Sequence, residues 1–151
     1  MSEQEIEKIF SRLIDIGYTI TSEETTEYNC IAWAANDTEA WWEPDPLYLS
    51  FWPTGVPRIY SLDAYIKAYQ TLGFIVCNSL EYEKDFEKIA IYVDNNGNPT
   101  HAARQLDSGS WTSKLGSLED IEHKTLDSLS EYGTVAVLMK RSTINKDNKS
   151  I

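Results

Sequence analysis

The hydrophobic periodicity of this chain changes between its two halves, and that change restricts the folds open to it. In the first half, apolar residues recur at helical spacing, and two of the segments concerned are 5–16 and 61–72. In the second half they alternate, in the runs 88–93, 100–106 and 111–115. The turn sequences between these runs suit antiparallel strands and are too short for parallel crossovers. The pattern predicts an α+β fold, with N-terminal helices packed on an antiparallel β-meander.

Two further elements are predicted after the meander. Residues 117–120, Ser-Leu-Glu-Asp, resemble the capping box that begins a helix, and an apolar stripe follows as far as Gly133. The continuous apolar run 134–139 predicts a central strand. Because residues 141–151 are polar, we expect a single domain over 1–140 followed by a disordered tail.

The charge of the chain disfavours two classes of partner. It carries 24 acidic and 13 basic residues, for a formal net charge of -11, and an acidic surface attracts neither nucleic acid nor anionic membranes. No apolar run approaches the length of a membrane span, and the acidic start lacks the features of a signal peptide. We therefore expect a cytoplasmic protein in which Cys30 and Cys77 are free thiols.

The segment 28–37 (YNCIAWAAND) places Cys30 in the first turn of a predicted helix. Asn29 suits the N-cap position, and the positive end of the helix dipole favours a thiolate there. Trp33 and Trp41 would share the helical face of Cys30. Cys30 is interpreted either as a nucleophile or as a small buried hydrophobic residue, which is the commoner role of a free cysteine.

The next segment, 41–57, combines four of the five prolines with several aromatic residues. Trp41, Trp42 and Trp52 contribute too much apolar area for a flexible linker, so this loop should be packed against the domain. Two interpretations stay open, namely a wall of a substrate groove and a loop that only covers the core.

The chain has two histidines. His101 begins the second predicted strand directly after a turn, where its imidazole could take the proton of the Cys30 thiol. His123 falls among charged residues of a predicted helix, and we interpret it as a solvated residue. These residues lack the spaced pairs of a structural zinc site, so we expect no metal and no other cofactor.

Three segments resemble the papain-like superfamily of cysteine peptidases and amidases, including its compact bacterial branches of the NlpC/P60 kind. Residues 30–34 (CIAWA) are similar to the Cys-Trp-Ala helix start of that family, and residues 100–103 (THAA) to its His-Ala strand start. Residues 111–116 (WTSKLG) are similar to the segment in which Asn orients the histidine. The motifs YNCIAWA, THAARQL and WTSKLG also resemble those of an uncharacterised family of small bacterial proteins. The resemblance covers residues 28–116 and implies a papain-like organisation with a Cys-His dyad.

The residue that would orient His101 is open on the sequence alone. Alignment on Gly116 places Ser113 there, where the family has a stronger acceptor such as Asn. A simple pairing of the two strands instead puts Thr112 and Lys114 on the face of His101.

The oxyanion donor also departs from the family. Papain-type enzymes have a Gln six residues before the Cys, and this chain has Glu24, whose carboxylate would repel an oxyanion. The hole would therefore need the backbone N–H of Cys30 together with Asn29 or another donor.

The sequence leaves two functions open. The first is a cysteine-dependent hydrolase or acyl-transferase that acts on an amide or thioester bond of a peptide or small acyl substrate, with Cys30 as nucleophile, His101 as base and Ser113 as orienting residue. In that case the thiol should ionise below about pH 7.5. The second is a non-catalytic acidic binding protein whose tryptophans contact a protein partner. The residues assigned to the groove or contact surface are Asn29, Trp33, Trp41, Trp42 and Trp52.

Overall fold

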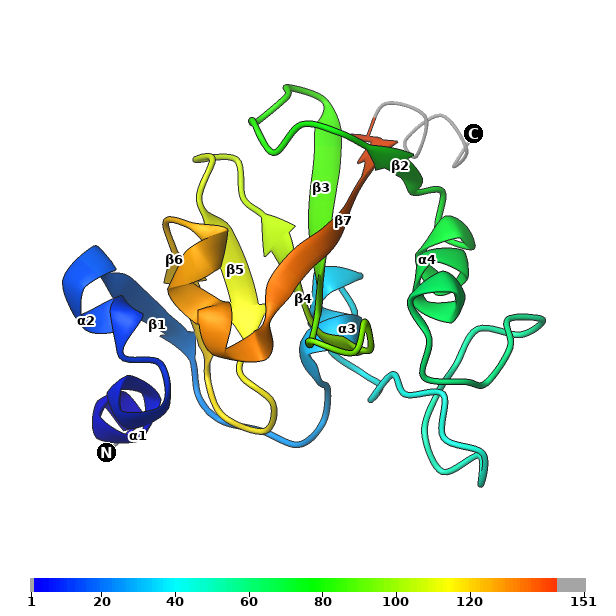
Figure 1. The fold of residues 1–151 in the computed structure, drawn as a ribbon, viewed down its shortest axis with the longest axis horizontal. Coiled ribbons are helices and arrows are strands. Elements are labelled where there is room, and N and C mark those ends of the chain that lie inside the picture. Colours follow the sequence, from blue (N-terminus) through cyan, green and yellow to red (C-terminus); the bar gives the residue numbers. More distant parts are fainter. Residues whose placement is uncertain (1, 144–151) are drawn as a thin grey trace.

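The structure is a computed structural model that describes residues 2–143, and its centre is a seven-stranded sheet in which all neighbouring strands are antiparallel (Figure 1). The order across the sheet is β1-β6-β5-β4-β3-β7-β2. The strands are β1 (Tyr18–Ser22), β2 (Ile75–Cys77), β3 (Phe86–Val93), β4 (Pro99–Gln105), β5 (Trp111–Lys114), β6 (Asp120–His123) and β7 (Thr134–Ser142). The helices are α1 (Ser2–Ile9), α2 (Arg12–Ile16), α3 (Cys30–Ala34), α4 (Leu62–Gln70) and the 3₁₀ helix η1 (Leu126–Tyr132). The α+β class is thus confirmed.

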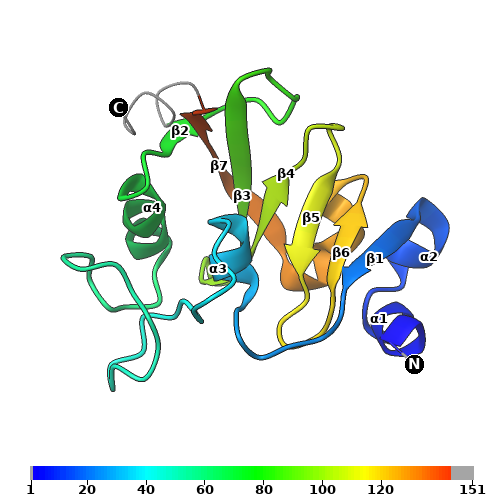
Figure 2. The ribbon, with the colours of Figure 1, turned by 180° about the vertical axis from the view of Figure 1, so that it is seen from behind.

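Each face of the sheet supports its own apolar core. On one face α3 and α4 pack on Ile89, Ile91 and Ala102, and Figure 2 shows α3 in front of the strands on this side. On the other face α1, α2 and η1 pack on Ala90 and Ala103. Figure 1 shows η1 as the orange coil in front of the sheet. The alternation of β3 and β4 therefore separates two layers that both contain buried residues.

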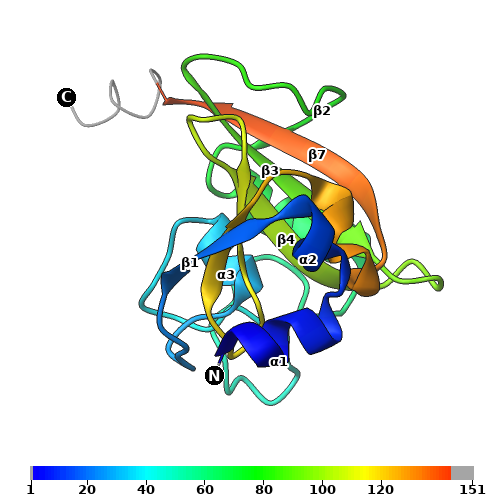
Figure 3. The same cartoon turned by 90° about the vertical axis from the view of Figure 1, so that its left-hand side faces the viewer.

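The N-terminal helical segment differs from the predicted single helix over 5–16. It is broken at Phe10 and Ser11 into α1 and α2. Leu13 is fully buried, whereas Ile14 after the break and Ile9 before it are 59% and 50% exposed. Figure 3 shows α2 beside η1, the element that it contacts.

The helix that begins at Cys30 is shorter than its apolar spacing predicts. It ends at Ala34, and Asn36 has a φ of 65°, a left-handed conformation that ends helices. Trp41 therefore does not lie on the helical face of Cys30.

The predicted helix after residue 117 is wrong in its first half. Residues 120–123 form strand β6, which pairs with β5 on one side and with β1 on the other, and η1 follows. The strand forms because two partners satisfy its backbone, and this outweighs the local capping signal. The run 134–139 lies in β7, which is next to the edge strand and not central.

Strand β7 continues to Ser142, past the predicted domain end at residue 140, and the guanidinium of Arg141 pairs with Glu87. The rest of the predicted disordered tail, 144–151, lies outside the described residues. Within 2–143, no helix is long and apolar enough to cross a membrane.

Candidate functional site

Cys30 is the first residue of α3 and is 9% exposed. The Asn29 side chain caps the helix, because its Oδ1 accepts from the Ala32 N–H at 3.1 Å. The same oxygen accepts from the backbone N–H of Trp42 at 3.0 Å, and Asn29 Nδ2 donates to the Trp42 carbonyl at 2.8 Å. Asn29 therefore fixes the start of the 41–57 loop beside Cys30.

The helix α3 is attached to strands β4 and β5 through Trp33. The Trp33 indole N–H donates to Thr112 Oγ1 at 3.0 Å, and the Arg104 Nε–H donates to the Trp33 carbonyl at 3.2 Å. The Arg104 guanidinium lies 4.8 Å from the Trp33 ring, whose other neighbour is the ring of Tyr28. Trp33 thus holds Cys30 against the sheet and is only partly available to a ligand.

His101 is fully buried near the start of β4. Its ring stacks on Tyr132 of η1, with centroids 4.0 Å apart and planes at 4°, and its centroid lies 5.2 Å from that of the Tyr92 ring, with the planes at 67°. Next to it along the strand, Ala102 belongs to the opposite core, the one that contains Cys30. His101 and Ala102 are therefore neighbours on β4 whose side chains enter the two different cores.

A chain of short hydrogen bonds connects His101 to His123 through Ser113; these three residues are called here the buried polar triad. His101 Nε2 lies 2.9 Å from Ser113 Oγ, which lies 2.8 Å from His123 Nε2. His123 Nδ1 lies 2.9 Å from the carbonyl oxygen of Thr125. The Ser128 hydroxyl donates to the same carbonyl at 2.6 Å.

The hydrogen-bond directions in the triad follow from the carbonyl at its end. The Thr125 oxygen can only accept, so His123 Nδ1 carries the proton. In a neutral imidazole the other nitrogen is then an acceptor, so the Ser113 hydroxyl donates to His123 Nε2. The Ser113 oxygen therefore accepts from His101 Nε2–H. What remains is the lone pair of His101 Nδ1, which is buried and has no hydrogen-bond partner among residues 2–143.

Burial keeps both imidazoles neutral. Desolvation lowers the pKa of His101 well below its usual range, and the neighbouring His123 acts in the same direction. Desolvation also lowers the pKa of His123, to about 4. Neutral rings are what the hydrogen-bond directions in the triad require.

The thiol of Cys30 is neutral as well. Burial raises its pKa to about 11, although the backbone N–H groups of Ala102, Ile31 and Cys30 and the charge of Lys114 favour the thiolate. The expectation of a thiol that ionises below about pH 7.5 is therefore not met in this structure, because desolvation outweighs the helix end.

The side chains of Cys30 and His101 face the cores on opposite sides of the sheet, and two electrostatic effects link their surroundings. The N–H that favours the Cys30 thiolate belongs to Ala102, which directly follows His101. The ring that stacks on His101, Tyr132, has its pKa raised mainly by burial and further by the charge of a Cys30 thiolate. No hydrogen bond joins Cys30 to His101, whose Nδ1 is unpartnered within 2–143.

The strand register decides between the two sets of residues considered for orienting His101. Gln105 pairs with Trp111, which puts Ser113 on the face of His101 and leaves Thr112 and Lys114 on the face of α3. The simple pairing is wrong by one residue. Ser113 is therefore the side chain that holds His101.

The predicted groove residues lie in different surroundings. Trp42 and Trp52 are 4% and 5% exposed and belong to the core that contains Cys30, so they do not form an exposed contact surface. Trp41 is half-buried, and its indole N–H donates to Glu43. Glu24 is exposed. No group of three or more His, Cys, Asp or Glu side chains in the described part of the chain is arranged to hold a metal ion.

Residues 19–140 match the model of a family described as a domain of unknown function, DUF7689. The chain belongs to this family. The DUF7689 match begins in β1 and contains Cys30 and the whole buried polar triad, whereas α1 and α2 precede it. No curated protein and no solved structure is significantly similar to the chain.

The role of His123 in the DUF7689 domain was missed from the sequence. Its prediction as a solvated residue depended on a helix that does not form, and in β6 it is 1% exposed. One residue of the sequence could have indicated a β-hairpin here. Gly116 has a φ of 63° and lies in the tight turn between β5 and β6. A hairpin at that glycine puts His123 opposite Trp111, on the face of Ser113.

Proposed function

We propose that this DUF7689 domain is a cysteine-dependent hydrolase or acyl-transferase, papain-like in organisation, that acts on an amide or thioester bond. The observation that carries the proposal is the free lone pair of His101 Nδ1. A buried imidazole whose other nitrogen is fixed by a serine is set up as a base, since its only open atom is an acceptor.

In this mechanism the proton moves during attack. The neutral Cys30 thiol gives its proton to His101 Nδ1 while Sγ bonds to the carbonyl carbon of the substrate. The resulting imidazolium protonates the leaving amine, and the acyl group stays on Cys30 as a thioester. Water, or an acceptor amine or thiol, then gives a proton to His101 and takes the acyl group, and the imidazolium returns that proton to the departing Cys30 thiolate.

Ser113 and His123 are positioning residues in this proposal. The His123 ring, fixed by the Thr125 carbonyl, makes the Ser113 hydroxyl point toward it and away from His101. Ser113 can then only accept from His101 Nε2–H, which keeps Nδ1 unprotonated. In this proposal Ser113, held between the two histidines, orients His101 in the way that a stronger acceptor such as Asn would.

The test is the trapping of an acyl group on the protein. Incubation with a panel of acyl thioesters and peptide p-nitroanilides, followed by intact-mass and peptide mass spectrometry, should give an adduct on Cys30. Cys30→Ala should abolish it, His101→Gln should slow it by roughly 10²–10⁴-fold, and the matched variant Cys77→Ala should leave it unchanged. Labelling on Cys77, or no adduct with any member of the panel, would overturn the proposal.

A second candidate, a non-catalytic interaction protein, is favoured by one observation. At the tip of the 41–57 loop Leu47, Tyr48 and Leu49 are 75%, 75% and 82% exposed. The tip is braced, because Asp45 accepts from the N–H groups of Leu49 and Ser50, and because the Arg58 guanidinium donates to Asp45 and lies 4.1 Å from the Tyr48 ring. Ordered, exposed apolar side chains of this kind are typical of contact surfaces.

This candidate makes a different prediction from the hydrolase. Leu49→Ser should remove association with a protein partner while the acyl adduct on Cys30 stays unchanged. If a hydrolase is present, Cys30→Ala should have the opposite pattern. Pull-down with the wild type and with both variants, scored by partners lost only in Leu49→Ser, separates the two.

A further inference from the structure

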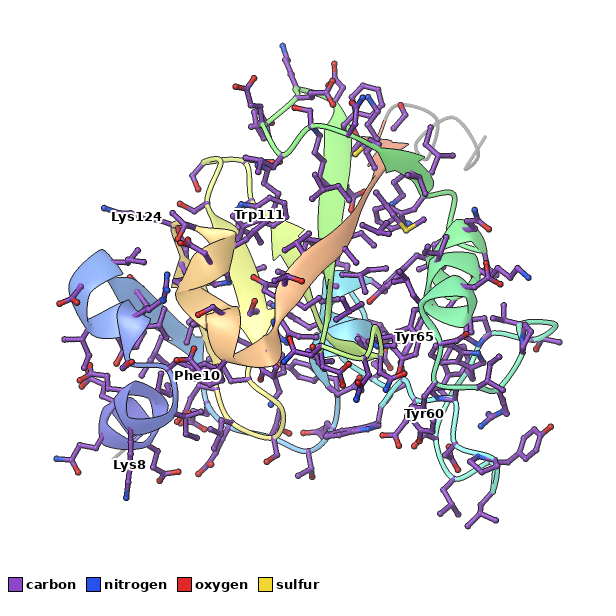
Figure 4. All side chains as sticks on the ribbon, viewed as in Figure 1. Lys8, Phe10, Tyr60, Tyr65, Trp111 and Lys124 are labelled. Carbon is purple, nitrogen blue, oxygen red and sulfur yellow. The ribbon has the colours of Figure 1, made fainter. Side chains whose placement is uncertain are left out.

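A pocket of about 870 Å³ opens on the η1 face of the sheet, and the proposed reaction does not use it. Its floor and walls include Tyr92 of β3, Trp111 of β5 and Val135 and Leu138 of β7. One side is formed by η1 and the other by the segment around Leu80. The volume lies within the range of small-molecule sites, roughly 300–1,000 Å³. Figure 4 labels Trp111 and Lys124, two of the lining residues, on the same side of the molecule.

Two polar side chains of the walls, Tyr92 and Gln105, are already hydrogen-bonded within the protein. The Tyr92 hydroxyl donates to the Leu126 carbonyl at 2.5 Å. The Gln105 amide donates to the Leu80 carbonyl at 2.8 Å and to that of Gly109 at 3.4 Å. These side chains therefore present carbon atoms to the pocket, and a ligand gains little by bringing hydrogen-bonding groups to them.

The charges at the pocket balance. Two cations, Arg12 and Lys124, and two carboxylates, Glu81 and Asp127, are among the lining residues. Arg12 and Asp127 form an ion pair at 3.4 Å, with both side chains more than half exposed. A pocket with no net charge does not select an ion, so the lining favours a neutral molecule.

We infer that this pocket is a binding site for an uncharged apolar small molecule, of the size of a medium-length alkyl chain or a fused aromatic ring. The floor supplies two aromatic side chains and two branched aliphatic ones, which are the groups that bind such ligands. The pocket is independent of Cys30, so the inference does not rest on the proposed function.

The test measures binding of an uncharged naphthalene dye whose emission rises in apolar surroundings, with 1-decanol and decanoate as competitors. The wild type should bind one dye per chain, and 1-decanol should displace it at lower concentration than decanoate. Cys30→Ala should bind as the wild type does. No saturable binding, or stronger competition by decanoate than by the alcohol, would overturn the inference.

Variants locate the site. Thr134 is exposed and lines the pocket, so Thr134→Trp should fill it and weaken dye binding at least tenfold, whereas Val76→Trp, on the exposed strand β2 outside this pocket, should not. Leu80→Ser should weaken binding at least about fourfold, the equivalent of one buried CH₂ group. Leu49→Ser is its matched control, because Leu49 is exposed and lies outside the pocket. Equal binding by Thr134→Trp and wild type, or loss of binding in Leu49→Ser, would place the dye elsewhere and refute the site.

Discussion

His101 Nε2 and Ser113 Oγ lie 2.9 Å apart, and this contact decides which nitrogen of the histidine stays free. It exists because β4 and β5 pair with Gln105 opposite Trp111. A shift of one residue would turn Ser113 to the face of α3 and leave His101 Nε2 buried without a partner. The register of a hairpin thus sets the protonation pattern of a candidate catalytic base.

The first prediction concerns the tautomers of the buried polar triad. Long-range ¹H–¹⁵N NMR should show His101 as the Nε2–H tautomer and His123 as the Nδ1–H tautomer. Ser113→Ala should lower the free energy of unfolding by about 1–3 kcal/mol, because it leaves buried histidine nitrogens unsatisfied. Ser130→Ala, in η1 but outside the triad, is the control and should change neither quantity. The Nδ1–H form of His101 in the wild type would contradict the deduced directions.

The second prediction is a loss of stability in acid. The pKa of His123 is lowered to about 4 by burial, against about 6.5 in an unfolded chain. The unfolded state therefore binds more protons between these values. The stabilisation is complete above about pH 6.5 and is lost as the pH falls through that window. The loss is about 3 kcal/mol, and His101, whose pKa is lowered too, acts in the same direction.

Urea titrations between about pH 7.5 and pH 4 measure this loss. His123→Gln should flatten the dependence on pH, since one of the two buried titrating groups is gone. Lys124→Gln removes a neighbouring exposed charge and should keep the wild-type slope. An unfolding free energy that is constant over this range would show that the histidines are not buried as neutral rings.

Much of the meander was predictable, because its information is local. Strands β3, β4 and β5 alternate and are bounded by turn residues, and the Ser61 side chain caps α4, where it accepts from the Ala64 N–H. Strands β1 and β6 were not predictable in this way. They pair with each other across about 100 residues of sequence, and β6 has a capping signal that favours a helix.

The candidate site, like the fold, was only partly predictable from the sequence. Cys30, Asn29 and His101 were predictable from their places at the start of a helix and of a strand. The link to His123 depends on two strand registers, and the raised pKa of Cys30 depends on burial by segments distant in sequence. Periodicity reports which face a residue occupies, but not how deeply the finished fold covers it.

The third prediction is that Cys77 reacts with iodoacetamide faster than Cys30 at neutral pH. Cys30 is buried, with a pKa raised to about 11, whereas Cys77 is partly exposed at the edge strand β2. Labelling rates from peptide mass spectrometry, measured in the wild type and in Cys77→Ala, separate the two thiols. Faster labelling of Cys30 would mean that the site opens in solution and exposes a more acidic thiol than the structure contains.

The fourth prediction compares neighbouring residues of α2. Leu13 is fully buried, so Leu13→Ala should lower the free energy of unfolding by about 2–5 kcal/mol. Ile14 is 59% exposed, and Ile14→Ala should stay within about 0.5 kcal/mol of the wild type. Similar losses in chemical denaturation would show that the break between α1 and α2 is absent in solution and that one continuous helix presents both residues to the sheet.

The last prediction concerns Gly133, which joins η1 to β7. Its φ of 118° is rare for residues with a side chain, and an added Cβ would overlap the carbonyl oxygen of Val93. Gly133→Ala should therefore cost more than the roughly 1–3 kcal/mol of the backbone conformation alone. Gly97→Ala is the matched control, because Gly97 also has a positive φ, 82°, but nothing lies within 4 Å of its added Cβ. The control should lose only about 1–2 kcal/mol.

Because Tyr132 precedes Gly133 and stacks on His101, the Gly133 variant should also disturb the His101 NMR signals while the control leaves them in place. Unchanged signals and equal losses in both variants would contradict the close approach of η1 to β3.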